Sequence, residues 1–97
     1  MGFDERCSWD DGKRRLNLVN HGYDFADLHV VFDGRFVVTR ADHRFDYGED
    51  RYNMLVEFEG RVINVTFTPR TARMHLISAR PASRDERSIY HERQASR

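Results

Sequence analysis

The stretch from residue 51 to residue 68 constrains the fold more than any other part of the sequence, because its pattern is typical of one β-hairpin. Two eight-residue runs, 51–58 and 61–68, flank Glu59-Gly60, a dipeptide that favours a two-residue turn. This spacing fixes the register of the two predicted strands. On one face every apolar side chain is then opposite another: Tyr52 with Phe67, Met54 with Val65, and Val56 with Ile63.

The other face of this predicted hairpin is polar at one end and mildly apolar at the other. The same register gives it four pairs: Arg51 with Thr68, Asn53 with Thr66, Leu55 with Asn64, and Glu57 with Val62. A face of this composition is able to stay open to a substrate, while the apolar face must be covered.

The segments before the hairpin predict two short helices that form an αα-hairpin. Asp10 is a candidate N-cap for a helix of about ten residues that points Leu16 and Val19 inward and ends at Asn20-His21-Gly22. Asp24 is the candidate N-cap of a second helix, which ends at Asp33-Gly34. Apolar residues recur along it at helical spacing: Phe25, Leu28 and Phe32.

Two further strands and a last helix complete the expected elements. Residues 36–39 and 73–80 read as strands, and the second of these has apolar residues on both faces. Ser83 and Glu86 form a capping box that starts a helix over residues 83–95. We expect this helix to cover the second side of the strand at 73–80.

Length and composition limit the class of protein. The chain has 97 residues, of which 39% are hydrophobic, so we expect a single domain spanning residues 1–97. Its longest apolar runs are three or four residues, whereas a membrane helix needs roughly 20. No secretory signal is visible at the N-terminus, and we therefore predict a cytoplasmic protein without membrane contact. Cys7, the single cysteine, cannot form an internal disulfide.

Charge is distributed unevenly along the chain. The 16 basic and 16 acidic residues cancel, which argues against a uniformly basic coat for nucleic acid. Residues 61–97, however, hold eight basic and three acidic side chains, a local excess of five positive charges. Fifteen of the 16 basic residues are arginine. This preference reflects either genomic base composition or a need for planar donors that grip phosphates.

An ordered set of residues runs through most of the chain. It consists of Trp9-Asp10, Lys13, Asn17, His21-Gly22, Phe25, Phe32, Tyr47-Gly48-Glu49, Arg51, Thr68, Arg70, Arg73, Ile77-Ser78-Ala79-Arg80, Ala82-Ser83, Arg87 and Tyr90. This set resembles the BrnT-type toxin family, and the resemblance extends from Trp9 to Tyr90. The sequence has Asn20 and His75 at two positions where that family usually carries a basic residue.

The resemblance implies both a fold and an activity. The fold is α+β and RelE-like, with the N-terminal helical hairpin packed on a four-stranded antiparallel sheet and a C-terminal helix; a short strand around residues 6–9 would make the sheet five-stranded. The activity is that of an endoribonuclease toxin of a type II toxin–antitoxin system, which inhibits translation by cutting RNA. Its partner is a BrnA-like antitoxin that also binds DNA, and the RNA is either free or presented by the ribosome.

Cutting RNA requires no metal ion if the 2′-hydroxyl of the substrate attacks the adjacent phosphate. The protein then supplies a base, an acid, and cations for the charge on the phosphoryl oxygens. We expect neither a metal nor another cofactor. The catalytic candidates are His21, Glu49, Arg51, Arg80 and Tyr90, and the candidates for binding RNA are Arg70 and Arg73.

Each candidate also has a purely structural explanation. His21 stands at a helix C-terminus, where the macrodipole favours imidazolium, but it also suits a simple cap. Glu49 and Arg51 could form an ion pair at a strand entrance, and Tyr90 could pack in the core. The hypothesis of catalysis rests most on Arg80, with Arg70 and Arg73 expected to converge on the same face.

Other sites and functions have less support from the sequence. The run 42–46 contains three potential metal ligands, but Arg44 in its middle makes it a poor site. An alternative function is a binding module that docks nucleic acid or an acidic partner on the basic last third without cutting it. We expect the antitoxin to cover the face that carries Arg51, Arg70 and Arg80, because acidic groups would oppose those arginines.

Overall fold

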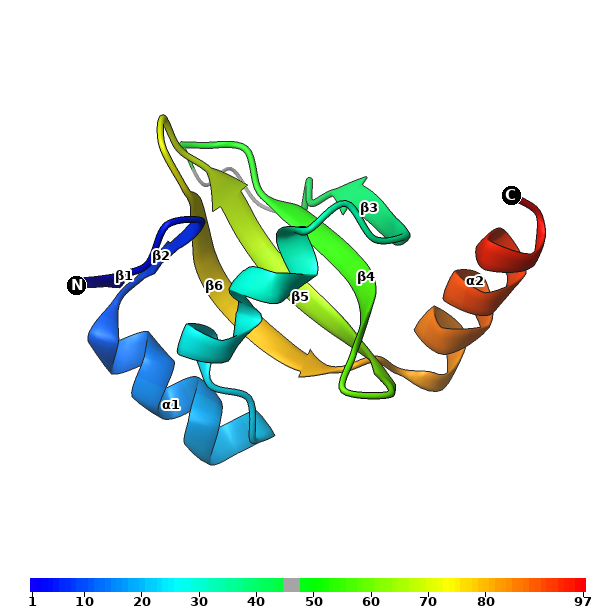
Figure 1. Cartoon of the computed structure of the whole chain (residues 1–97), viewed down its shortest axis with the longest axis horizontal. Helices are drawn as coiled ribbons and strands as arrows, with labels where there is room; N and C mark the ends of the chain where they lie inside the picture. Colours follow the sequence, from blue (N-terminus) through cyan, green and yellow to red (C-terminus); the bar gives the residue numbers. More distant parts are fainter. Residues whose placement is uncertain (45–47) are drawn as a thin grey trace.

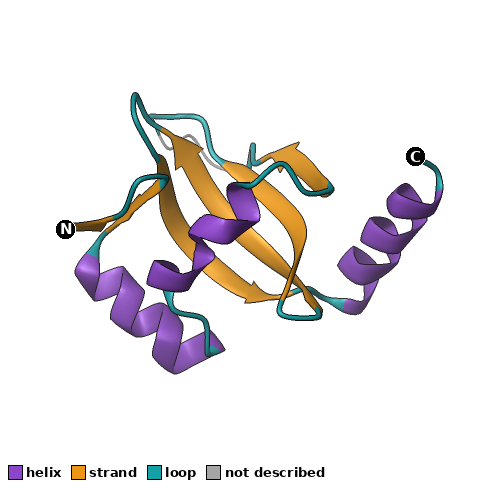
Figure 2. Ribbon diagram, in the orientation of Figure 1, coloured by secondary structure: helices purple, strands orange, loops and turns teal. Residues whose placement is uncertain are grey.

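The computed structural model describes residues 1–44 and 48–97, and in them the chain forms one α+β unit around a six-stranded mixed sheet (Figures 1 and 2). The strands lie in the order β1-β2-β6-β5-β4-β3. In chain order the elements are β1 (Gly2–Phe3), β2 (Cys7–Trp9), α1 (Asp11–His21), η1 (Phe25–Phe32), β3 (Val37–Ala41), β4 (Tyr52–Phe58), β5 (Arg61–Pro69), β6 (Met74–Pro81) and α2 (Arg84–Ala95).

The central hairpin has the register that its sequence predicts. Strands β4 and β5 pair Tyr52 with Phe67, and Asn53 with Thr66 on the opposite face. Glu59 and Gly60 both have positive φ values, 51° and 80°, as a tight turn between twisted strands requires. The apolar face of the hairpin is buried, since Val56, Ile63 and Val65 are fully enclosed.

The expected sheet of four or five antiparallel strands is wrong in number and in direction. β1 and β2 extend the sheet beyond β6, and β2 runs parallel to β6, with Cys7 beside Met74 and Trp9 beside Leu76. The strand expected near residues 6–9 is present as β2. Strands of two and three residues are too short to show an alternating pattern, so their pairing partners cannot be recognised in the sequence.

The second predicted helix is η1, a 3₁₀ helix instead of an α-helix, so the N-terminal αα-hairpin is not present. Its cap is as expected, because the Asp24 side chain accepts a hydrogen bond from the Ala26 amide. A 3₁₀ helix has three residues per turn, and the buried side chains recur at that interval. They are Phe25, Leu28 and Val31, whereas Phe32 is half-buried and meets Phe67 edge-on at 5.3 Å.

Helix α1 lies along the edge of the sheet beside β6, and it does not bury Leu16 or Val19 as predicted. The exposed fractions of these side chains are 62% and 76%. The helix is instead attached through Asn17, whose side chain accepts a hydrogen bond from the Ala79 amide and donates one to the Ala79 carbonyl, both at 2.9 Å. The caps at Asp10 and Gly22 are confirmed.

Helix α2 starts as predicted but covers a different part of the sheet. Ser83 and Glu86 form the capping box, and Tyr90 packs in a second small core with Val38, Leu55 and Val62. These contacts place α2 over β3 and β4, away from β6 (Figure 1). A β-bulge opposite Thr66 and Phe67 turns both Leu76 and Ala79 into the main core, so β6 needs no helix on its other side.

One side of the sheet is therefore apolar and covered by η1, and much of the other side is polar, with no described helix over its β2 end. We call this second side the open face. No helix in the described residues is long and apolar enough to cross a membrane. The open face carries Ser8, Asn53, Asn64, Thr66, Thr68, His75, Ser78 and Arg80, as the strand registers show.

Candidate functional site

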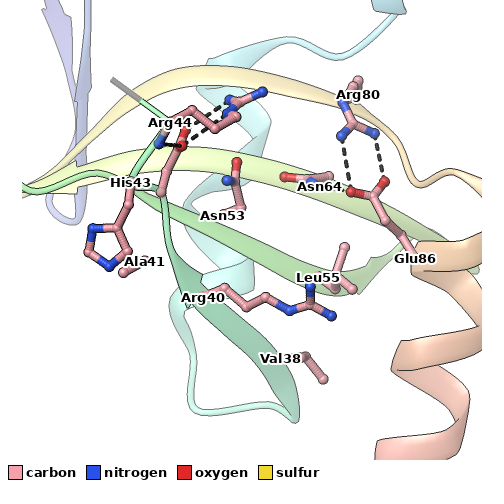
Figure 3. Close-up of a pocket in the computed structure, with 11 residues that line it drawn as sticks. Val38, Arg40, Ala41, His43, Arg44, Asn53, Leu55, Asn64, Arg80 and Glu86 are labelled. Atoms are coloured by element: carbon pink, nitrogen blue, oxygen red, sulfur yellow. Dashed lines mark hydrogen bonds and ion pairs between the residues drawn. The ribbon is translucent and has the colours of Figure 1, made fainter. Parts of the chain in front are cut away.

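One end of the open face, next to α2, holds a pocket of about 290 Å³ that we call the Arg80 pocket. Its floor is formed by Asn53 and Asn64 of the central strands, and Arg40 from β3 and Arg44 line it as well. Figure 3 shows both asparagines between Arg44 and the ion pair of Arg80 with Glu86. The pocket thus combines amide groups with several guanidinium groups, a set that suits an anionic, hydrogen-bonding ligand.

Arg80 is held in place by a fork of two hydrogen bonds. Its guanidinium donates to both carboxylate oxygens of Glu86, at 2.7 and 3.0 Å. Glu86 also accepts from Asn64 at 2.7 Å and from the Ser83 amide in the capping box. The Arg80 guanidinium is the main reason why the pKa of Glu86 is lowered to about 2. Arg80 therefore attaches the start of α2 to the sheet, and its side chain also lines the pocket.

The opposite end of the open face is built around a buried histidine, and we call it the His75 end. The parallel pairing of β2 with β6 sets Ser8 beside His75, and Ser8 Oγ lies 2.8 Å from His75 Nδ1. Burial lowers the pKa of His75, and the positive charges of Arg70 and Lys13 lower it further, while Glu49 opposes them. The neutral imidazole is thus favoured near pH 7.

Three of the predicted site residues also lie at the His75 end. Arg70 follows β5 and forms an ion pair with Glu49, with 3.5 Å between Nη2 and Oε1. Arg51 immediately precedes β4. It also lies next to the end of β5, since the Thr68 hydroxyl donates a hydrogen bond to the carbonyl of Asp50, the residue before Arg51. The structure therefore brings Glu49, Arg51 and Arg70 to one end of the face; the sequence analysis considered an ion pair of Glu49 with Arg51, and the ion pair described at Glu49 is with Arg70.

The three arginines expected to converge do not do so. Arg73 and Arg80 stand at opposite ends of β6, and seven residues of extended strand span roughly 23 Å. Arg73 donates to the Asp4 carbonyl at 2.6 Å, and its guanidinium lies 4.5 Å from the Phe3 ring. It is thus committed to the N-terminal strand, while Arg70 and Arg80 occupy the two ends of the open face.

His21 lies apart from the open face, and Tyr90 packs against Val38 and Leu55 of the Arg80 pocket without lining it. His21 is the last residue of α1, is exposed, and is hydrogen-bonded to no other candidate residue. Tyr90 is 2% exposed and meets the Phe36 ring edge-on at 5.3 Å. Burial raises the pKa of the Tyr90 hydroxyl. These positions favour the structural explanations of both residues, as a helix end and as a core ring.

The described residues contain no group of three His, Cys, Asp or Glu side chains that could hold a metal ion. In the 42–46 run, Asp42 is instead engaged by Arg44 at 2.8 Å. Phe45 and Asp46 of that run, and Tyr47 of the family set, lie outside the described residues. Cys7 is fully buried, and burial raises the pKa of its thiol to about 12, so it stays protonated at neutral pH.

The family model for the ribonuclease toxin BrnT of type II toxin–antitoxin systems matches residues 9–86. The chain belongs to the BrnT toxin family. Membership in the BrnT family implies a ribonuclease toxin, with RNA as substrate and an antitoxin as partner. The matched residues include Arg70, His75 and Arg80, and so both ends of the open face. No curated protein sequence gives a significant match.

Sequence reasoning did not identify the contact between Ser8 and His75. His75 stood out only as a position where the family usually has a basic residue. The signal that could have found it is strand alternation, because extending the hairpin face through Thr68 onto β6 leads to His75. Ser8 could not be found in this way, since it belongs to the three-residue strand β2.

Proposed function

We propose that this chain is a metal-independent endoribonuclease that binds RNA along the open face and inhibits translation by cutting it. The observation that carries this proposal is the polar side of the sheet, the open face, with arginines at both of its ends. RNA presents a row of phosphates, and a surface with separated guanidinium groups can bind more than one of them.

The reacting phosphate is placed at the His75 end in this proposal. Arg70 and Arg51 supply the cations that stabilise the charge gathering on the phosphoryl oxygens, and Glu49 orients Arg70 through their ion pair. Arg80 lies about five residues, or roughly 16 Å, further along β6. It is therefore proposed to hold another phosphate of the same RNA strand, with its guanidinium kept in place by Glu86.

The antitoxin is proposed to be a BrnA-like protein that binds over the open face. Acidic groups of such a partner would oppose Arg70 and Arg80 and would keep RNA away from them. Complex formation should then weaken as the salt concentration rises, since partly exposed charges are screened. An interface restricted to α1 and η1, with Arg70 and Arg80 left accessible to RNA, would contradict this part of the proposal.

The direct experiment is cleavage of a defined RNA in the presence of excess chelator. Wild-type protein should produce fragments with a 2′,3′-cyclic or 3′-phosphate on one product and a 5′-hydroxyl on the other. Arg70→Ala should reduce the rate on the order of 10²–10³, the effect of removing one preorganised donor to the transition state. Arg93→Ala is the matched control, because Arg93 is an exposed arginine near the end of α2.

The outcomes separate the two candidate functions. Loss of cleavage in chelator, or full activity of a folded Arg70→Ala variant, would contradict the proposed mechanism. If wild-type protein retains RNA in a salt-sensitive gel shift and produces no fragments with free RNA or with translating ribosomes, the chain is a binding module. In that case the basic end of the chain docks nucleic acid without chemistry.

A further inference from the structure

We propose that His75 is the general base of the cleavage reaction and that Ser8 is the residue that positions its imidazole ring. This inference rests on the proposed function and extends it, because it assigns the proton transfer to a side chain of β6 on the open face. Its basis is the contact of the imidazole with Ser8, which leaves the other ring nitrogen available, together with the positive charge of the nearby Arg70.

The two ring nitrogens of His75 have different surroundings. Nδ1 lies 2.8 Å from Ser8 Oγ, a hydroxyl that can donate to this nitrogen or accept from it. In the tautomer that the proposal assigns, Nδ1 carries the proton and donates to Ser8, and the lone pair is on Nε2. Nε2 has no hydrogen-bond partner in residues 1–44 and 48–97, and it is not among the enclosed polar atoms of that part of the chain. Nε2 is therefore positioned to accept a proton from a ligand on the open face.

The position of Ser8 is a direct result of strand pairing. β2 and β6 run parallel, and the register sets Ser8 beside His75 while Cys7 and Trp9 point into the core. Both side chains are 8% exposed, so the pair is rigid and mostly desolvated. A base held in this manner does not need to be ordered when the substrate binds.

The charged groups around the imidazole favour a base that is neutral before the reaction. Burial is the largest cause that lowers the pKa of His75, followed by Arg70 after β5 and, more weakly, Lys13 of α1. Glu49 and Asp10 raise the pKa and partly offset these effects. The neutral form is thus the resting state at pH 7, and the same Arg70 and Lys13 would attract the phosphate to be attacked.

The step is a transesterification within the RNA. Nε2 takes the proton of the 2′-hydroxyl, and the electron pair of the 2′-oxygen forms a bond to phosphorus. The bond from phosphorus to the 5′-oxygen breaks, and the departing oxygen takes its electron pair and then a proton from solvent. The imidazolium is stabilised by its Nδ1 hydrogen bond to Ser8, and it later releases the extra proton to solvent.

The test is the pH dependence of single-turnover cleavage at saturating protein, in chelator. For wild-type protein we expect the rate to fall about tenfold for each pH unit below the His75 pKa, as for any base that must be deprotonated. His75→Asn should lower the plateau rate by roughly 10²–10⁴ and remove this acidic limb of the pH profile, and added imidazole should restore part of the rate.

The variant of the positioning residue and the control have different expected profiles. Ser8→Ala should lower the cleavage rate and keep the acidic limb of the pH profile. His91→Asn, on an exposed face of α2, is the control.

A parallel binding measurement distinguishes catalysis from substrate binding. The probe is the same RNA with a 2′-deoxyribose at the cleaved position, which cannot react, and His75→Asn should bind it as wild type does. Two results would overturn the assignment of the base. One is a His75→Asn variant whose cleavage rate and acidic limb are the same as those of wild type. The other is a His75→Asn variant that loses RNA binding by the same factor as it loses cleavage rate. If His75→Asn does not fold, an unaltered rate in Ser8→Ala overturns the pair. Absence of cleavage by wild-type protein overturns the proposed function itself.

Discussion

The two faces of the central sheet are made by the same strands but differ in the chemistry of their side chains and in what covers them. The covered face pairs Tyr52 with Phe67 and buries Val56 and Ile63 completely beneath η1. The open face places amides, hydroxyls, an imidazole and a guanidinium at the alternate positions of those strands and their neighbours. Some of its polar groups are satisfied within the face, as where Thr66 donates to Asn53 at 2.8 Å, and others by neighbouring segments, as where Asn64 donates to Glu86 of α2.

This difference shows how one alternating pattern can specify a core and a site together. A period of two residues assigns every second side chain to the core, and the remaining ones are then free to carry chemistry. The stability of the domain should depend on the covered face, and its activity on the open face. Substitutions at adjacent positions of one strand can test that separation.

The largest stability effect is expected on the covered face of β5. Phe67→Ala should lower the free energy of unfolding by about 3–5 kcal/mol, because it removes a buried ring that contacts Tyr52 and Phe32. The neighbouring Thr66→Ala, which removes one hydrogen bond on the open face, should lower it by about 0.5–1.5 kcal/mol. Denaturant titrations measure both, and equal losses would contradict the division of roles.

A smaller but still large effect is expected at the sheet edge. Asn17→Ala should lower the free energy of unfolding by about 2–4 kcal/mol, because it leaves the amide and carbonyl of Ala79 without partners. Asn20→Ala, on an exposed position of the same helix, should change it by less than about 0.5 kcal/mol. A mild effect at Asn17 would show that α1 is attached by other contacts.

Acid should weaken the link between the open face and α2. The pKa of Glu86 is about 2 in the folded protein and its ordinary value is 4.5, so its ion pair with Arg80 stabilises the fold above pH 4.5. That stabilisation, about 1–3 kcal/mol after allowance for partial exposure, is lost as the pH falls from 4.5 towards 2. Urea titrations of wild type and Glu86→Gln should therefore differ at pH 7 and converge near pH 2, whereas Glu92→Gln should follow wild type throughout.

The smallest effect is expected for the apolar side chains that α1 exposes. Leu16→Ser and Val19→Ser should each change the free energy of unfolding by less than about 0.5 kcal/mol, since both side chains stay largely exposed in the folded protein. Leu28→Ser, in the fully buried position of η1, is the contrasting variant. Strong destabilisation by Leu16→Ser in the isolated chain would place α1 against the core.

The central hairpin and the helix caps could be predicted from the sequence because their signals are local. The register of β4 with β5, the caps of α1 and η1, and the capping box at Ser83 all depend on residues a few positions apart. The apolar spacing of η1 was misread because intervals of three and four residues look alike in a short segment. Here Val31, and not Phe32, completes the buried row.

The remaining features depend on contacts between segments distant in sequence. The sequence predicted that Leu16 and Val19 point into the core, but α1 is attached through the polar side chain of Asn17, which accepts a hydrogen bond from the backbone of β6. The ion pair of Glu49 with Arg70 could have been predicted, since both residues flank the predicted hairpin. The pairing of Ser8 with His75, 67 residues apart, required the parallel strand β2, which no pattern in the sequence indicates.

The central claim, that RNA binds along the open face, is tested most directly by methyl NMR. The protein is labelled at its Thr, Leu and Val methyl groups and titrated with RNA that carries 2′-deoxyribose at the cleaved position. We predict that the largest chemical-shift changes occur at Leu55, Thr66 and Thr68, with small changes at the exposed Leu16 and Val19 of α1. Shifts concentrated on Leu16 and Val19, with Thr66 and Thr68 unmoved at saturation, would contradict the claim.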